Sequence, residues 1–249
     1  MYLKQLLRDT RETLHSFLDL LFPPRCAACK RTGALLCAAC ISAMPLLNSP
    51  FCPRCAGPLS SPLGCVSCLS HPLLLNGLRA YGPYCNPLRS CIHALKYHGY
   101  TRLARPLGHL LALAYRRYAM QADLITPVPL HQERLRRRGY NQAQLLAEVC
   151  AAELNLPLQP LLVRTRATPP QVHLNISERR RNVAGAFYRL PSLSPETISG
   201  RRILLIDDVC TTGATLGACA APLFAAGASA VWGLVLARPA LSTKRVGQR

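Results

Sequence analysis

The sequence predicts an α/β domain, built on a mostly parallel sheet flanked by helices, behind a small cysteine-rich module. From residue 73 onward, apolar segments of strand length alternate with segments of helical periodicity, and this alternation is typical of a parallel sheet. Eight of the thirteen cysteines fall between Cys26 and Cys68, all in Cys-x-x-Cys pairs. Half of the 249 residues are apolar, which is ample for a buried core.

The N-terminal segment, residues 1–24, is predicted to form an amphipathic helix. Its leucines and phenylalanines recur at helical spacing, with charged residues between them. Lys4, Arg8, Asp9 and Glu12 interrupt the apolar core that a signal peptide needs, and no apolar run elsewhere is long enough to span a bilayer. We therefore expect a cytoplasmic protein with no membrane span, whose cysteines stay reduced.

Residues 25–72 are predicted to form a separate module that binds structural zinc. Four Cys-x-x-Cys pairs supply two sets of four thiolates, the number that a tetrahedral zinc site needs. The predicted ligands are Cys26, Cys29, Cys37, Cys40, Cys52, Cys55, Cys65 and Cys68. Two zinc ions are the simplest count, although ligands of the two halves could also interleave. A redox role would need one such pair, not four.

The larger domain is expected at residues 73–238, followed by a polar tail at 239–249. Strands are predicted at 77–84, 123–130, 202–206 and 229–237, and helices at 88–97, 106–120, 141–154 and 213–226. The basic stretch after residue 130 is predicted to be a loop. The arginine-rich stretch from 164 to 182 carries two adjacent prolines and is predicted to be a long functional loop.

Residues 203–215 are predicted to bind a sugar phosphate. The predicted site residues in this run are Asp207, Asp208, Thr211, Thr212, Gly213, Ala214 and Thr215. Open α/β sheets bind ligands where strands end and helices begin, and a glycine turn there can present backbone N–H groups to a phosphate. The two acids suit the vicinal hydroxyls of a ribose. The alternative, a pair of N-capping acids, leaves the three threonines and the glycine unexplained.

This run resembles the PRPP-binding signature of the type I phosphoribosyltransferases, in which four apolar positions and two acids precede a Thr-Thr-Gly-x-Thr turn. Cys210 is a mild departure, because an aliphatic residue is more usual there. The resemblance implies a type I phosphoribosyltransferase-like fold, PRPP with Mg²⁺ as ligand, and catalytic, ribose-holding roles for Asp207 and Asp208. It also implies a pyrophosphate loop after an earlier strand. The candidates for that loop are Pro127, Val128, Pro129, Arg134 and Arg138, and the alternative is a solvated basic patch.

In that family a lid closes over PRPP, and the stretch from 164 to 182 would play this part. The lid candidates are Arg164, Arg166, Thr168, Gln171 and Arg179. Closure would exclude water, which would otherwise hydrolyse an oxocarbenium-like intermediate.

Several motifs in one order extend the resemblance over most of the chain. They are the cysteine module, Leu95-Lys-Tyr-His-Gly99, Pro127-Val-Pro-Leu-His131, Arg134-Leu-Arg-Arg-Arg-Gly-Tyr-Asn-Gln142, Arg164-Thr-Arg-Ala-Thr-Pro-Pro-Gln171, Arg181-Asn182 and residues 203–215. With these motifs the chain is similar to the ComF family of competence-associated, phosphoribosyltransferase-like proteins. The resemblance implies a double zinc ribbon and a cytoplasmic role in the uptake or use of single-stranded DNA.

The charge of the chain favours a polyanionic partner. Thirty Lys and Arg against eleven Asp and Glu give a formal charge of +19. The expected partners are PRPP or ribose 5-phosphate, single-stranded DNA, and a DNA-uptake or helicase-like protein. Two functions stay open: a phosphoribosyltransferase that transfers a pentosyl group, and a non-catalytic nucleotide-sensing or single-stranded-DNA-binding adaptor on the same fold.

Overall fold

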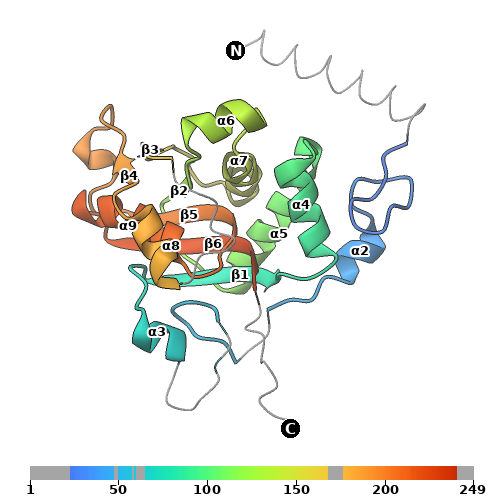
Figure 1. Ribbon diagram of the computed structural model, residues 1–249, viewed down its shortest axis with the longest axis horizontal. Helices are drawn as coiled ribbons and strands as arrows, with labels where there is room; N and C mark the ends of the chain where they lie inside the picture. Colours follow the sequence, from blue (N-terminus) through green and yellow to red (C-terminus); the bar gives the residue numbers. More distant parts are fainter. Residues whose placement is uncertain (1–22, 48–49, 58, 60–64, 168–175, 240–249) are drawn as a thin grey trace.

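The computed structural model describes residues 23–47, 50–57, 59, 65–167 and 176–239 of the chain (Figure 1). The helix predicted over residues 1–24 lies almost wholly outside the described residues, as does the predicted tail from residue 240. Within the described part of the chain, no helix is both long and apolar enough to cross a bilayer.

A four-stranded parallel sheet forms the centre of the domain, which confirms the predicted fold class. Its strands lie in the order β1 (Gly77–Pro83), β6 (Ala230–Arg238), β5 (Arg202–Val209) and β2 (Leu124–Pro127). Along β5, Ile203, Leu204, Leu205 and Ile206 are all fully buried, because both faces of the strand are covered. Pro127 pairs with Ile206, so β2 and β5 end at the same edge of the sheet.

Three helices cover one face of the sheet: α4 (Leu88–Tyr97), α5 (Ala104–Arg117) and α7 (Gln142–Leu154) (Figure 1). Their apolar sides share one core with Leu204 and Ile206 of β5. Asn141 caps α7 by accepting a hydrogen bond from the Ala143 amide at 3.0 Å. The last turn of α4 brings Lys96 to the carboxyl end of β5.

The other face is covered by α9 (Ala214–Ala225), α8 (Ile176–Val183) and a small antiparallel sheet of β3 (Leu162–Arg164) and β4 (Phe187–Arg189). Leu205 faces this side and packs with apolar residues of α9. Because side chains alternate along a strand, Asp207 continues the row of Leu205 toward α9, and Asp208 continues the row of Ile206 toward α4. The two adjacent acids therefore face opposite sides of the sheet.

The cysteine module carries two short helices, α2 (Ala38–Ser42) and α3 (Val66–Ser70), which lie well apart beside the domain (Figure 1). Cys26 and Cys40 are buried in the same core as α4. Cys52 and Cys55 pack with Leu73 in a separate small cluster. All thirteen cysteines are described, and the structure shows each of them as a free thiol. Two 3₁₀ turns, η1 (Thr101–Leu103) and η3 (Pro195–Thr197), complete the described elements.

Both stretches predicted to be loops contain helices. The basic stretch after β2 forms α6 (Gln132–Arg138), in which His131 Nδ1 accepts from the Glu133 amide and Gly139 ends the helix with φ +84°. The stretch from 164 to 182 begins with the last residue of β3 and ends in α8. No residue of α6 is buried, and α8 is mostly charged and polar. Apolar periodicity, on which the prediction depended, is therefore weak in both helices.

Candidate functional site

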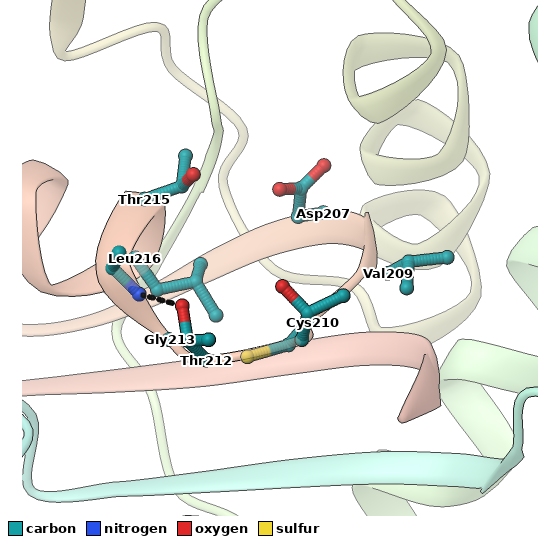
Figure 2. Close-up of a pocket in the computed structure, with 9 residues that line it drawn as sticks. Asp207, Val209, Cys210, Thr212, Gly213, Thr215 and Leu216 are labelled. Atoms are coloured by element: carbon teal, nitrogen blue, oxygen red, sulfur yellow. Dashed lines mark hydrogen bonds between the residues drawn. The ribbon is translucent and has the colours of Figure 1, made fainter. Parts of the chain in front are cut away.

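A small pocket opens at the carboxyl end of β5, where the strand leads into α9 (Figure 2). It holds about 260 Å³ of open space. Its walls are Asp207, Val209, Cys210, Thr211, Thr212, Gly213, Ala214, Thr215 and Leu216. The structure thus brings together every residue predicted for this run except Asp208. Val209, Cys210 and Leu216 line the pocket without having been predicted as site residues.

The turn before α9, residues 210–213, is shaped to receive an anion. Gly213 has φ +80°, a conformation that glycine adopts at no steric cost, and it stands at the N-cap of α9. The first amides of a helix lack helical acceptors and lie at the positive end of its dipole. The Ala214 amide donates to Thr212 Oγ1 over 3.4 Å, drawn dashed in Figure 2, so it is only weakly engaged. Amides, hydroxyls and the helix dipole here suit an anionic ligand, so we call residues 210–213 the anion-binding turn.

Asp207 is the acid that faces the pocket. Its carboxylate lies on the same side of the turn as the Thr215 hydroxyl (Figure 2). The backbone amide of Asp208 donates to Asp207 Oδ1 at 2.8 Å, which orients the carboxylate. Burial, followed by the negative charge of Asp208, raises the pKa of Asp207 to about 8. A ligand with hydroxyl groups close to its phosphate matches this combination of an acid and an anion-binding turn.

Asp208 is bonded to Lys96 of α4 on the other face of the sheet. Lys96 Nζ lies 2.5 Å from Asp208 Oδ2, and Asp208 is almost fully buried. Burial raises the pKa of Asp208, but the ammonium group of Lys96 outweighs burial and holds that pKa below its ordinary value. No role of Lys96 is predicted from the sequence. The signal that could have found it is the Leu95-Lys-Tyr-His-Gly99 motif, which the predicted chemistry left unexplained.

The segment predicted to follow the earlier strand lies beside β5. Pro127 ends β2 and Val128 and Pro129 follow it, and the Val128 amide donates to the Ile206 carbonyl at 2.9 Å. The side chain of Asn141 donates to the Val128 carbonyl at 3.0 Å and holds the segment against α7. These residues therefore lie at the same sheet edge as the pocket.

Arg134 and Arg138 project from α6 instead of a loop. Arg138 donates to the side-chain oxygen of Gln142, and its guanidinium lies 5.7 Å from the ring centre of Tyr97. Burial, followed by the charge of Arg134, lowers the pKa of Arg164, so these two arginines face the same region. Among the described residues that line the pocket, neither Arg134 nor Arg138 is found.

The predicted lid residues divide between two places. Arg179, on α8, donates to Thr211 Oγ1 at 2.8 Å and thus reaches the turn. Arg164 ends β3 instead, where it is buried with its guanidinium 5.2 Å from the ring centre of Phe187. Arg166 donates to two backbone carbonyls at the end of α8. Thr168 and Gln171 lie outside the described residues.

Exposed aromatic rings gather at the end of α4, next to Lys96. Tyr97 is 62% exposed and Tyr100 is 46% exposed. The ring of His93 lies 4.7 Å from that of Tyr97, and Arg138 approaches the same tyrosine. We call Tyr97, Tyr100, His93 and Arg138 the Tyr97 face. Lys96, which pairs with Asp208 of β5, directly precedes Tyr97 in the chain.

The eight predicted zinc ligands form two clusters of four sulfur atoms, all within 4.8 Å of one another in each cluster. The first cluster is Cys26, Cys29, Cys37 and Cys40, and the second is Cys52, Cys55, Cys65 and Cys68. Zn–S bonds of about 2.3 Å in a tetrahedron place sulfur atoms about 3.8 Å apart. Sγ separations of 3.7 Å (Cys29 to Cys37) and 3.8 Å (Cys52 to Cys68) match this geometry. Each half of the module forms a zinc site of its own, and the ligands do not interleave.

Known proteins are similar to parts of this chain. A family model described as a double zinc ribbon domain matches residues 17–69. One similar solved structure is glutamine PRPP amidotransferase from B. subtilis complexed with ADP and GMP, with 17% identity and a TM-score of 0.40, over 58% of this chain and 30% of that chain. The fold and the site define the class: an α/β protein with an anion-binding turn at the carboxyl edge of a parallel sheet, joined to a double zinc ribbon.

Two named proteins of similar sequence show to which family of this class the chain belongs. DNA utilization protein YhgH of Escherichia coli is 36% identical over 224 residues, which cover 85% of this chain and 96% of that protein. Competence protein F of Haemophilus influenzae is 33% identical over 211 residues, which cover 81% of this chain and 90% of that protein. The chain therefore belongs to the ComF family of DNA utilization and competence proteins, the family that its motifs resemble.

Proposed function

We propose that the protein binds the ribose 5-phosphate part of PRPP, accompanied by Mg²⁺, in the pocket at the end of β5. The observation that carries this proposal is the Asp207 carboxylate beside a glycine turn at a helix N-terminus. The amides and hydroxyls of residues 211–215 would receive the 5-phosphate, and Asp207 would accept hydrogen bonds from the ribose hydroxyls. Asp208 supports this acid through its backbone amide, while Lys96 holds Asp208.

The proposed chemistry is pentosyl transfer in the cytoplasm. The bond between ribose C1 and the pyrophosphate oxygen breaks, an acceptor nitrogen bonds to C1, and pyrophosphate leaves. Positioning and charge stabilisation supply most of the rate in such a reaction. The groups proposed for the leaving pyrophosphate are the segment of Pro127, Val128 and Pro129 with Arg134 and Arg138. Arg179 already contacts the turn and would act in the lid with Arg164, Arg166, Thr168 and Gln171.

Calorimetry with ribose 5-phosphate and with PRPP, in the presence of Mg²⁺, tests the binding site. At pH 9, where Asp207 with its pKa of about 8 is mostly ionised, Asp207→Asn is expected to weaken binding roughly tenfold or more, because a hydrogen bond to a charged group is lost. Asp123→Asn is the matched control, since it makes the same chemical change at the opposite edge of the sheet, where Asp123 pairs with Arg202. Absence of heat with the parent protein, or equal affinity in Asp207→Asn, would contradict the proposal.

A second assay separates the enzyme from the adaptor. Pyrophosphate release from PRPP is measured with free bases or single-stranded DNA as acceptors, in the parent and in Asp207→Asn. Release that the substitution abolishes supports transfer chemistry. Binding of PRPP without turnover on any acceptor supports the non-catalytic adaptor.

The Tyr97 face favours a second activity, the binding of single-stranded DNA. Unpaired bases stack on exposed aromatic rings, and cations beside the rings attract the backbone. The +19 charge of the chain and the arginines of α6 supply that attraction. The names of the relatives concern DNA utilization and competence, which agrees with this partner.

Fluorescence anisotropy with a labelled oligothymidylate tests this activity. Affinity should fall steeply with salt, and replacement of Arg136, Arg137 and Arg138 by alanine should weaken binding and flatten the salt dependence. Tyr97→Ala should weaken binding roughly tenfold through lost stacking. Tyr188→Ala, on β4 and 54% exposed, is the control and should bind as the parent does. Affinity that does not depend on salt would exclude this activity.

A further inference from the structure

The second cysteine cluster is connected to the anion-binding turn through residues that contact both. Leu73, which follows the cluster in the chain, is buried with Cys52, Cys55 and Cys65. A Cβ atom on Gly213 would lie 2.3 Å from Leu73 Cδ2, so the leucine touches the turn at its glycine. This apolar contact is the first of three links between the zinc module and the turn.

Arg238, the last residue of β6, makes the second link. It is only 7% exposed, and its Nη1 atom donates to Cys210 Sγ in the turn at 3.4 Å. A Cβ atom on Gly57 would lie 3.1 Å from Cys55 Sγ and 3.4 Å from Arg238 Nη2. The Arg238 guanidinium and the Cys55 sulfur of the cluster therefore both lie next to Gly57. A buried cation needs opposite charge close by. Four thiolates around one Zn²⁺ carry a net negative charge and supply it.

Helix α8 makes the third link. Arg180 donates to the carbonyls of His71 and Pro72, at 2.8 Å and 3.1 Å, in the segment that leaves the second cluster. Its neighbour Arg179 donates to Thr211 of the turn. The first cluster has a different place, because its buried cysteines belong to the core of α4.

We propose that Arg238 is a positioning residue that couples the second zinc site to the anion-binding turn. With zinc bound, the thiolates of the second cluster hold Arg238, and Arg238 holds Cys210, so loading of this site orders the turn. Coupling between two sites is reciprocal, and a sugar phosphate in the turn therefore retains zinc in the second cluster. The sugar-phosphate part rests on the proposed function, and the part that joins zinc to the turn does not.

Zinc release from the full-length protein to the dye pyridylazoresorcinol, together with hydrogen exchange of residues 210–216, tests the coupling. Arg238→Met is expected to release one of the two zinc ions roughly tenfold faster and to speed exchange in the turn, because a charged hydrogen-bonding group is lost. Arg189→Met is the matched control, since it removes another partly buried arginine, which donates to the Leu193 carbonyl. Arg238→Lys keeps the charge and should restore most of the zinc retention.

Should Arg238→Met fail to fold, Cys210→Val tests the same link from the other side. It removes the acceptor sulfur of the turn and leaves Arg238 beside the cluster. Faster exchange of residues 210–216 with unchanged zinc content supports the coupling. Unchanged exchange overturns it.

The last measurement repeats the zinc-release assay with ribose 5-phosphate at a saturating concentration. In the parent protein ribose 5-phosphate should slow the release of one zinc ion about fivefold, and this protection should vanish in Arg238→Met. If calorimetry registers ribose 5-phosphate binding while zinc release and exchange are the same in Arg238→Met and Arg189→Met, the coupling is wrong and the proposed function stands. If ribose 5-phosphate does not bind but Arg238→Met speeds both processes, the coupling is supported and the proposed ligand is wrong.

Discussion

Asp207 and Asp208 adjoin each other in β5, and their negative charges would repel if both were left without compensation. Lys96 resolves this conflict by pairing with Asp208 in the interior. Asp207 is left facing the pocket with a raised pKa, caused first by burial and then by the charge of Asp208. One acid is thereby committed to structure, and the other is available to a ligand.

Lys96→Met is expected to lower the free energy of unfolding by about 3 kcal/mol at neutral pH, because it leaves the Asp208 carboxylate buried without its cation. In the parent, Lys96 overcomes burial and holds the pKa of Asp208 below its unfolded value. The contribution of the pair is therefore complete above about pH 4 and is lost as the pH falls further. In urea denaturation the difference between parent and variant should shrink below that pH.

The double variant Lys96→Met with Asp208→Asn serves as the control for this pair. It removes both charges, so it should recover most of the stability that the single variant loses. A double variant as unstable as Lys96→Met would show that the loss comes from packing, and the assigned charge pairing would then be wrong.

Asp207 should give ligand binding a pH dependence of its own. With its pKa raised to about 8, the acid is mostly protonated at pH 7 and mostly ionised at pH 9. Ionised carboxylates are the stronger acceptors for hydroxyl groups, so affinity for ribose 5-phosphate should rise up to about tenfold over this interval. The phosphate itself titrates near pH 6 and contributes little there. Calorimetry on Asp207→Asn should give a flat profile, and a flat profile in the parent would refute the assignment.

At the residue scale, the pocket was the most predictable part of the site. Threonines, a glycine and acids at a strand end predict an anion-binding turn from local chemistry alone. The partners of Asp208 and Cys210 could not be predicted in this way, because Lys96 and Arg238 lie far away in the chain and meet them only after folding.

At the scale of elements, the entry into α9 depends on Gly213 for two reasons. Its φ of +80° is strained for any residue with a Cβ atom, and that atom would meet Leu73 at 2.3 Å. Gly213→Ala is therefore expected to cost about 3 kcal/mol of unfolding free energy, from strain and overpacking together. Gly139→Ala, at φ +84° with open space around it, should cost about 1 kcal/mol from strain alone. Denaturant titration gives the free energy of unfolding of both variants. The difference between their two losses is the cost of the steric contact with Leu73.

Leu73→Ala combined with Gly213→Ala completes this comparison. The smaller side chain removes the clash but not the backbone strain, so the second substitution should cost less in the Leu73→Ala background. Equal costs for Gly213→Ala and Gly139→Ala in the parent would argue against close packing between Leu73 and the turn.

The buried elements could be predicted, and the exposed ones could not. Strand β5 and helices α4 and α7 carry apolar patterns, and the structure confirms them with ends shifted by a few residues. Helix α6 lacks a buried face, and its existence depends on the His131 cap and the left-handed Gly139. Strands β3 and β4 have three residues each, too few for a recognisable alternation.

At the scale of the molecule, the two zinc sites support two different sides of the pocket. The first cluster lies beside α4, the helix that holds Asp208 through Lys96. Burial, followed by the charge of Cys26, raises the pKa of Cys91 on α4, so this helix is close to the cluster. The second cluster packs on the turn through Leu73 and Arg238. The cysteine spacing predicts the two clusters. Which side of the pocket each cluster supports depends on contacts with distant strands and helices, and these contacts are not visible in the spacing.

This arrangement predicts that loss of the first zinc site loosens α4 more than α7. Cys29→Ser removes an exposed ligand of the first cluster, and the exposed Cys85, which is no ligand, provides Cys85→Ser as the matched control. Without metal the cluster cannot keep Cys26 beside Cys91 of α4, so amides of α4 should exchange at least about tenfold faster. Helix α7 packs on α5 and β5 and should change far less. Hydrogen exchange read by mass spectrometry distinguishes the outcomes, since equal acceleration in both helices would mean that the first zinc site holds the whole domain together instead of one side of its pocket.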